Sequence, residues 1–520
     1  MDKYQMNKNK QVVVNLSSSL VAFVVSLLIS FFLSPYIIKT LGVEANGFVS
    51  LANTFINYAT LITIALNSMA GRFITIAINE GDYKKANKYY NSVFVGNLAI
   101  TLMLLIPAII CIIRLEHIIN ISDNLIMDVK TLFSILFLNF FIATAMPNWA
   151  TATFATNKIY LQSLRGIEAN ILRVVTILIL FAFLSPHIYY VGVATLISAI
   201  YSTYFNRYYQ KKLIPELVIS YSYFRWETIK ELVSSGIWNS ITNAGQMLLS
   251  GLDLLITNLF IGPVEMGVLA LAKTIPNIIT SLASTITSVF SPSMTIDYAK
   301  GDHESLRENI VQGMKITGML LSIPLAMFMV YGKEFYMLWV PSEDAQVLQV
   351  LSILTCGGLI FTCSIQCLYN VFTVVNKLKV SSLLLLLSGA ISTIIVFILL
   401  KTTNLGVFAV AGVSTVVNLI RNLAYTTPVA SKYLNFKWNT FFPEVIRSVN
   451  SIIILIIVGI IIKQIIPAQS WIMLVLSASV MGFSGIIISL FTIIDKKTRK
   501  AIVKKVIQIF SSKSRIKGEY

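Results

Sequence analysis

Two stretches of the sequence decide the fold: residues 41–55, LGVEANGFVSLANTF, and residues 261–275, IGPVEMGVLALAKTI. They align without a gap at an offset of 220 residues, and the same register extends to residue 82 with 12 identities in 42 positions. Several identities are not apolar filler and are the strongest sign of common origin: Gly42/Gly262, Gly47/Gly267, Gly81/Gly301 and Asp82/Asp302. The chain therefore contains an internal repeat.

The composition around this repeat is that of a membrane protein. Of 520 residues, 56% are hydrophobic and only 12% are charged, whereas soluble domains carry about 25% charged residues. A soluble enzyme is excluded. A spanning helix needs about 20 apolar residues, so the apolar side chains suffice for about 14 spans. Runs such as SIIILIIVGIIIK (451–463) do not alternate in polarity, which excludes a membrane β-barrel. The sequence predicts an all-α polytopic membrane protein.

Apolar runs predict fourteen transmembrane helices, and twelve to fourteen is the range that the weaker segments leave open. The fourth, fifth and seventh segments are the weakest, because polar residues interrupt or separate them. The predicted segments are 12–34, 46–69, 92–113, 131–147, 168–185, 188–208, 230–260, 265–291, 312–331, 346–371, 379–400, 406–429, 443–462 and 471–494.

The positive charge follows the predicted loops. Lys and Arg number 40 and Asp and Glu 23, a net charge of +17 that would suggest nucleic acid in a soluble protein. With the N-terminus inside, 33 basic residues fall on the cytoplasmic side and 6 outside, with Lys273 within a span. This asymmetry obeys the positive-inside rule. We expect both termini in the cytoplasm, no cleavable signal peptide and no nucleic-acid partner.

The repeat also predicts the domain organisation. Its offset contains six predicted helices, an even number, so both copies cross the membrane in the same direction. Parallel repeats are typical of transporters, with the substrate site near mid-membrane between the halves. We expect an N-lobe at 1–215 and a C-lobe at 216–432, related by a pseudo-two-fold axis. Two extra helices (433–494) and a basic amphipathic tail (495–520) follow, the tail lying on anionic lipid.

The repeat and the segment FITIAINEGDYKKANKYYNSVF (73–94) resemble the polysaccharide-lipid flippases of the multidrug/oligosaccharidyl-lipid/polysaccharide superfamily, in particular the O-antigen and capsule repeat-unit flippases. The resemblance is clearest over residues 35–90. In the rest of the chain it consists of the predicted number and order of transmembrane helices. It implies that the protein translocates an undecaprenyl-diphosphate-linked oligosaccharide from the cytoplasmic to the outer leaflet of a bacterial inner membrane by alternating access. It also implies that a polysaccharide polymerase and glycosyltransferases are candidate partners. MATE-type cation-coupled exporters share this fold and are the alternative.

Charged residues inside the predicted spans are the candidate functional residues, because each costs about 2.5 to 3.5 kcal/mol to insert. Lys273 (matched with Asn53 by the repeat) and Arg421, with Arg173 and Arg72 nearer the cytoplasmic ends, are expected to attract the diphosphate. The alternative is structural: Lys273 pairs with Asp253, while the two outlying arginines reach to the headgroups.

Three further residues complete the predicted site. Asp253 is a candidate proton- or cation-coupling carboxylate, with an ion pair as the alternative. Asn57 and Asn277, equivalent in the repeat, are candidate ligands of sugar hydroxyls, with interhelical hydrogen bonds as the alternative. The three histidines lie far apart, and no HExxH, P-loop or nucleophile elbow occurs. We expect no enzyme activity, no cofactor and no metal site.

Overall fold

The computed structural model describes residues 8–494 and Arg499, and this part of the chain forms helices and no β-strand. The predicted tail at 495–520 lies outside the described residues except for Arg499. The described helices pack into two compact units. Among the described residues, the first unit contains 8–271 and 385–390, and the second contains 272–384, 391–494 and Arg499.

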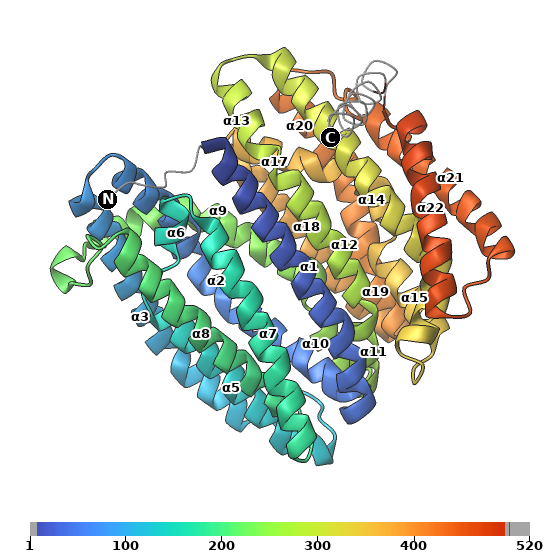
Figure 1. Cartoon of the computed structure of the whole chain (residues 1–520), viewed down its shortest axis with the longest axis horizontal. Coiled ribbons are helices and arrows are strands. Elements are labelled where there is room, and N and C mark those ends of the chain that lie inside the picture. Colours follow the sequence, from blue (N-terminus) through green and yellow to red (C-terminus); the bar gives the residue numbers. More distant parts are fainter. Residues whose placement is uncertain (1–7, 495–498, 500–520) are drawn as a thin grey trace, which may run out of the picture. The chain divides into compact units, whose positions relative to one another are not determined.

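Unit 1 is built from long helices that lie side by side in the blue to green part of the ribbon (Figure 1). The helix α1 packs on α7, α2 packs on α3 and α9, and α8 packs on α5 and α7. A π-helix, Met247–Gly251, joins α9 to α10. The helices are α1 (Lys8–Leu41), α2 (Val43–Asn79), α3 (Tyr83–Ile113), α4 (Leu115–Ile118), α5 (Ile126–Ala145), α6 (Thr151–Ala155), α7 (Ile159–Phe183), α8 (Tyr189–Leu213), α9 (Trp226–Gln246), α10 (Asp253–Phe260) and α11 (Pro263–Ala272).

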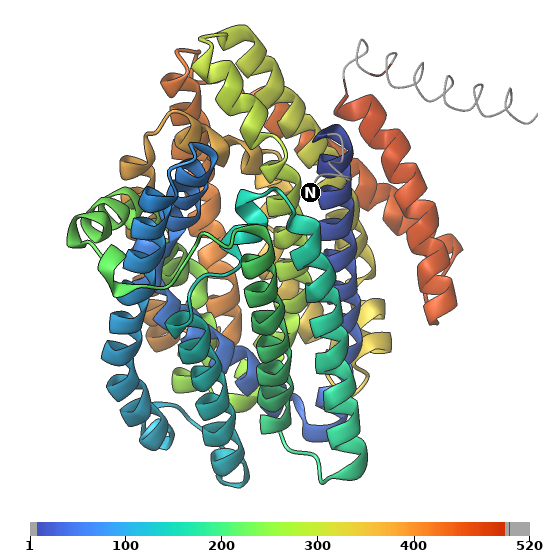
Figure 2. The same cartoon turned by 60° about the vertical axis from the view of Figure 1, so that its left-hand side comes forward.

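Unit 2 is organised around α14, against which α21 and α22 pack. These two helices form the red hairpin in Figure 2. A π-helix, Asn422–Thr426, joins α19 to α20. The helices are α12 (Thr274–Ser288), α13 (Ser291–Ala299), α14 (His303–Trp339), α15 (Ala345–Cys356), α16 (Leu359–Thr362), α17 (Tyr369–Val374), α18 (Leu378–Thr402, with 385–390 counted in unit 1), α19 (Val407–Arg421), α20 (Thr427–Tyr433), α21 (Phe442–Ile465) and α22 (Trp471–Thr492).

The all-α polytopic fold is confirmed, and every predicted span lies on a helix or a run of helices. Eleven helices in the described residues are long and apolar enough to cross a membrane, or twelve if the broken pair Pro263–Ala272 and Thr274–Ala299 is one span. The segments at α8 and at α9 with α10 are helical but fall outside that set. Fourteen spans therefore stay a prediction. The lobe boundary at residue 215 also stays a prediction, because the compact units describe how the chain packs and not where the repeat divides it.

The repeat is visible in the backbone at the Gly-Asp pairs. Gly81 and Gly301 both have positive φ, 78° and 70°, a conformation that glycine adopts without steric cost. Each following aspartate caps the next helix: the Asp82 carboxylate accepts from the Lys85 N–H at 2.8 Å, and the Asp302 carboxylate accepts from the Ser305 N–H at 3.0 Å. The two copies therefore end one helix and begin the next in the same way.

A second turn is repeated in the two halves of the chain, at an offset of 219 residues. The ungapped alignment at an offset of 220 does not reveal it. Asn157 and Asn376 both have positive φ, 54° and 53°, in the related stretches TNKI and VNKL. The next N–H closes each turn: Lys158 donates to Thr153 at 2.8 Å and Lys377 donates to Phe372 at 2.9 Å. Asparagine tolerates this left-handed conformation better than other side chains do. The repeat thus extends well beyond residue 82.

Candidate substrate-binding site

Arg173 is a cation near the middle of the helix α7, and its Nε has no hydrogen-bond partner among the described residues. The helix α7 begins at Ile159, nine residues before the predicted start, so Arg173 lies near the helix centre and not near its cytoplasmic end as expected. Its side chain is half-buried, and its Nε is buried with no hydrogen-bond partner. It forms no ion pair with any residue that the structure describes. A guanidinium at this depth needs an anion or water to offset its desolvation.

Arg421 is the second mid-span arginine, twelve residues before the end of the Val407–Tyr433 span. Its Nη2 donates to Asn418 Oδ1 at 2.8 Å and lies 3.4 Å from the Tyr369 hydroxyl, while its Nε is buried without a partner. The Tyr369 hydroxyl donates to Asn422 Oδ1 at 2.8 Å. Asn418, Tyr369 and Asn422 form a neutral cradle, and no described carboxylate forms an ion pair with the guanidinium.

The π-helix Asn422–Thr426 explains how this cradle forms. Its wider turn follows Arg421 directly and leaves Asn422 fully buried, where Thr426 Oγ1 donates to Asn422 Oδ1 at 3.0 Å. π-Helices are rare and frequently occur at functional sites. The pattern of apolar residues does not predict a π-helix here. The sequence does show, however, that Asn418, Arg421 and Asn422 lie within five residues of one another.

Lys273 and Asn277 lie one turn apart in unit 2. The chain leaves helical hydrogen bonding at Lys273, and α12 begins at the next residue, so that the Asn277 N–H donates to the Lys273 carbonyl at 3.0 Å. Lys273 is half-buried and Asn277 is exposed. The pair therefore presents a cation and an amide along one helix edge.

Asn57 and Arg72 lie on α2 in unit 1, and both side chains are exposed. Asn57 lies in the middle part of α2, whereas its repeat equivalent Asn277 lies in the first turn of α12, and both residues are exposed. An exposed amide at mid-span faces either lipid or water, and water is strongly preferred. Arg72 lies seven residues before the end of α2, as predicted, where its guanidinium is long enough to reach the headgroups.

Asp253 is buried, with a side chain 6% exposed, and it begins α10 directly after the π-helix of unit 1. A carboxylate in the first turn of a helix is stabilised by the helix dipole. The Tyr58 hydroxyl donates to the Gly251 carbonyl at 2.9 Å two residues earlier. Asp253 and Lys273 belong to different compact units, so their pairing stays a prediction. The described residues contain no group of three or more His, Cys, Asp or Glu side chains that could hold a metal ion.

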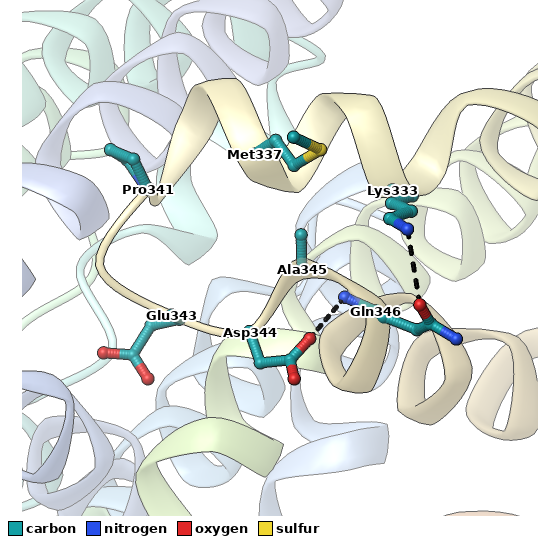
Figure 3. Close-up of a pocket in the computed structure, with 7 residues that line it drawn as sticks. All are labelled: Lys333, Met337, Pro341, Glu343, Asp344, Ala345 and Gln346. Carbon is teal, nitrogen blue, oxygen red and sulfur yellow. Dashed lines mark hydrogen bonds between the residues drawn. The ribbon is translucent and has the colours of Figure 1, made fainter.

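A separate cavity of about 400 Å³ lies at the α14–α15 turn (Figure 3). It contains none of the predicted site residues. Its lining includes Lys333, whose Nζ donates to Gln346 Oε1 at 3.3 Å, and Glu343. Burial raises the pKa of the Glu343 carboxyl above its ordinary value. This turn connects two spans and is not the mid-membrane site.

Solved structures of membrane transporters share this fold. The lipid II flippase MurJ in an inward closed conformation aligns with a TM-score of 0.66 at 12% identity, covering 91% of this chain and 98% of that one. An inward-facing MATE family multidrug resistance transporter of the MOP superfamily aligns with a TM-score of 0.59 at 16% identity, covering 81% and 99%. At these identities the likeness concerns the fold, which is that of membrane transporters and flippases.

The sequence comparison is more specific. Residues 12–296 match the family described as "Polysaccharide biosynthesis protein". The protein described as "Uncharacterized membrane protein EpsK" of Bacillus subtilis (strain 168) is 29% identical over 492 residues, covering 95% of this chain and 97% of that protein. The chain belongs to the polysaccharide biosynthesis protein family. This confirms the resemblance to membrane proteins of polysaccharide biosynthesis, and the fold is one that MOP-superfamily transporters also adopt.

Proposed function

We propose that the protein is a flippase that moves an undecaprenyl-diphosphate-linked oligosaccharide from the cytoplasmic to the outer leaflet of a bacterial inner membrane, for O-antigen or capsule synthesis. The observation that carries this proposal is the pair of mid-span arginines, Arg173 and Arg421, each with a buried Nε that lacks a partner. A membrane protein does not retain two such cations for packing alone, because burying an unpaired charge is costly. The substrate that they favour is anionic.

A diphosphate matches these two groups chemically. Guanidinium donates paired hydrogen bonds to phosphate oxygens, and such charge-assisted bonds are about twice as strong as neutral ones. Lys273 adds a compact positive charge, and Arg72 offers an entry point near the cytoplasmic end of α2. The exposed amides of Asn57 and Asn277 are suited to sugar hydroxyls, which both donate and accept.

Alternating access requires two bodies, and the repeat supports the assignment of lobes to residues 1–215 and 216–432. The 33 to 6 distribution of basic residues supports cytoplasmic termini. Glycosyltransferases that build the substrate and a polymerase that consumes it are the expected partners. Asp253, buried beside a π-helix, is the candidate for coupling to protons or cations.

MATE-type export of organic cations is the second candidate, because the fold is shared. Two observations disfavour it. The helix α1 contains no acidic residue that could couple to an ion, and the unpaired arginines would repel a cationic drug.

Depletion of the protein tests the proposal. Labelled lipid-linked oligosaccharide should accumulate in the cytoplasmic leaflet, and surface polysaccharide should decline. Re-expression of the chain should reverse both effects. Unchanged distribution of the labelled lipid, together with altered drug resistance, would establish the exporter instead.

A further inference from the structure

The cytoplasmic end of α3 lies at the membrane surface in the proposed topology. The uncharged part of α3, Tyr89–Ile113, has 25 residues, and Val93–Ile113 makes up its last 21. At about 1.5 Å per residue Val93–Ile113 spans the roughly 30 Å hydrocarbon core without help from the preceding turns. The residues Tyr83–Ser92, which include three lysines, therefore lie at headgroup level.

A pair of buried asparagines on these turns binds the connection between α8 and α9. Asn87 Nδ2 donates to the Glu216 carbonyl at 2.8 Å, and Asn87 Oδ1 accepts from the Val218 N–H at 2.9 Å. Asn91, one turn further, repeats the pattern: its Nδ2 donates to the Val218 carbonyl at 2.9 Å and its Oδ1 accepts from the Ser220 N–H at 2.8 Å.

We call the side chains of Asn87 and Asn91 the asparagine clasp. The clasp gives the backbone of Glu216–Ser220 the hydrogen bonds that an edge strand would form in a sheet. Ser92 extends it, since its Oγ accepts from the Arg225 N–H at 3.0 Å. Asn87 and Asn91 are only 3% and 1% exposed. Backbone that approaches lipid must have its polar groups satisfied within the protein, and the clasp meets that condition. Figure 2 shows the segment as the green loop beside the blue α3.

The clasped segment and the residues that follow it, as far as the first residue of α9, turn large side chains outward. Leu217 is buried, but Ile219, Tyr221 and Trp226 are 53%, 68% and 56% exposed. Tyrosine and tryptophan with apolar bodies and polar tips are the side chains that prefer the membrane interface. In a flexible loop, such apolar side chains would pack against the protein surface. The asparagine clasp fixes the backbone, so that these side chains stay exposed.

The charges nearby suit anionic headgroups. Residues 80–92 and 211–231 together carry seven Lys and Arg and five Asp and Glu, an excess of two positive charges. Lys211 and Lys212 end α8 just before the segment. Each basic residue near a membrane surface contributes about 1 kcal/mol to binding of anionic lipid.

We propose that Val218–Trp226 is a membrane-surface anchor, held by Asn87 and Asn91, that inserts its aromatic and aliphatic side chains among the anionic phospholipids of the cytoplasmic leaflet. The anchor fixes the depth of unit 1 in the bilayer. It relies on the proposed orientation for the identity of the leaflet but not on transport.

Spin labels test the anchor in the full-length chain. Tyr221→Cys and, as the matched control, Ser342→Cys in the exposed α14–α15 turn are labelled with a nitroxide in nanodiscs that contain phosphatidylglycerol. Oxygen partitions into lipid and a nickel chelate into water, so their collision rates report depth. The unmodified chain, with cysteines at 111, 356, 363 and 367, gives the background.

We expect the oxygen-to-nickel ratio at position 221 to exceed that at position 342 by about threefold or more. Replacing phosphatidylglycerol with phosphatidylcholine should lower the ratio at 221 and leave 342 unchanged. Asn91→Leu in the Tyr221→Cys background should also lower it, with helicity checked by circular dichroism. Equal ratios at 221 and 342, or a ratio at 221 indifferent to lipid charge, would overturn the anchor. The measurement involves no flipping and is therefore independent of the proposed function.

Discussion

Gly47 and Gly267, which occupy the same place in the two repeats, touch each other in unit 1. A Cβ on Gly47 would lie 2.7 Å from Gly267 Cα, and a Cβ on Gly267 would lie 2.4 Å from the Val43 carbonyl oxygen. A contact between equivalent residues is what the predicted pseudo-two-fold axis requires where it passes between α2 and α11, and the axis itself stays a prediction. Glycine is required on both sides because backbone faces backbone.

Gly267→Ala should therefore destabilise the protein by about 1 to 3 kcal/mol, since overpacking against backbone cannot be relieved by a rotamer change. The midpoint of thermal unfolding in detergent measures the effect. Gly71→Ala is the control, because its Cβ would meet nothing within 4 Å, and it should leave the midpoint unchanged or raise it. Equal midpoints for both variants would contradict the close contact.

Arg173→Gln and Arg421→Gln should each reduce surface polysaccharide by about tenfold or more, since each removes a charge-assisted contact to the diphosphate. Arg421→Lys should also fail, because an ammonium cannot supply the paired donors of a guanidinium. The assay is complementation of the depleted strain with membrane protein quantified. Arg207→Gln is the control, because the exposed Arg207 has an aromatic partner, with its guanidinium carbon 5.6 Å from the Trp149 ring centre. Full polymer output from both glutamine variants would remove these arginines from substrate binding.

Asp302 should give the protein an acid-sensitive helix cap. Hydrogen bonds from the Ser305 backbone N–H hold the pKa of this carboxyl below its ordinary value. A carboxyl whose pKa is lowered by folding stabilises the folded chain at any pH above its pKa in the unfolded chain, about 3.9. This stabilisation is lost as the pH falls through the lower pKa of the folded chain.

Asp302→Asn tests this, because asparagine caps the helix without titrating. At pH 7 the wild-type chain should be the more stable of the two, and the difference should shrink as the pH falls below about 4. Thermal unfolding across pH 2.5 to 7 gives the comparison. A difference that does not vary with pH would rule out the charged cap.

The ion pair between Lys463 on α21 and Glu334 on α14 should hold the α21–α22 hairpin against α14 within unit 2. Lys463 Nζ lies 2.7 Å from Glu334 Oε1 and donates to the Val330 carbonyl at 2.8 Å. The pair is partly exposed, so we expect Glu334→Leu alone to cost about 1 to 3 kcal/mol, less than a fully buried pair.

A double-mutant cycle with Lys463→Leu separates the pair from packing. The double variant should recover part of the stability that each single variant loses, because no unpaired charge remains. Strictly additive losses in thermal unfolding would mean that the two side chains do not interact.

Much of the fold was predictable because its causes are local. Long apolar runs must cross the membrane as helices, since only a helix satisfies its own backbone there. The Gly81/Gly301 identity was found as part of the repeat, and the structure shows positive φ at both glycines. The turn at Asn157 and Asn376 was missed because a one-residue change of offset lies outside an ungapped alignment.

The candidate site was predicted only as a set of residues. Inserting a charge in a span is unfavourable whatever its neighbours, so sequence alone selected Arg173 and Arg421. The predicted start of this helix was nine residues too late, because polar residues occupy the first turns of α7, which begins at Ile159. The π-helix after Arg421 was also unpredictable, since both helix types bury the same apolar residues.

By itself, the sequence determined the membrane class, the helical spans and the repeat, because hydrophobicity and backbone hydrogen bonding act along the chain. Only the tertiary structure decided which polar side chains surround each charge. Tyr369, for example, contacts Arg421 although it lies 52 residues away in the sequence, on another helix. The tertiary structure also decided that Gly47 meets Gly267 and that Asn87 and Asn91 clasp the segment after α8. Pairing and burial depend on packing between helices, and no local pattern encodes them.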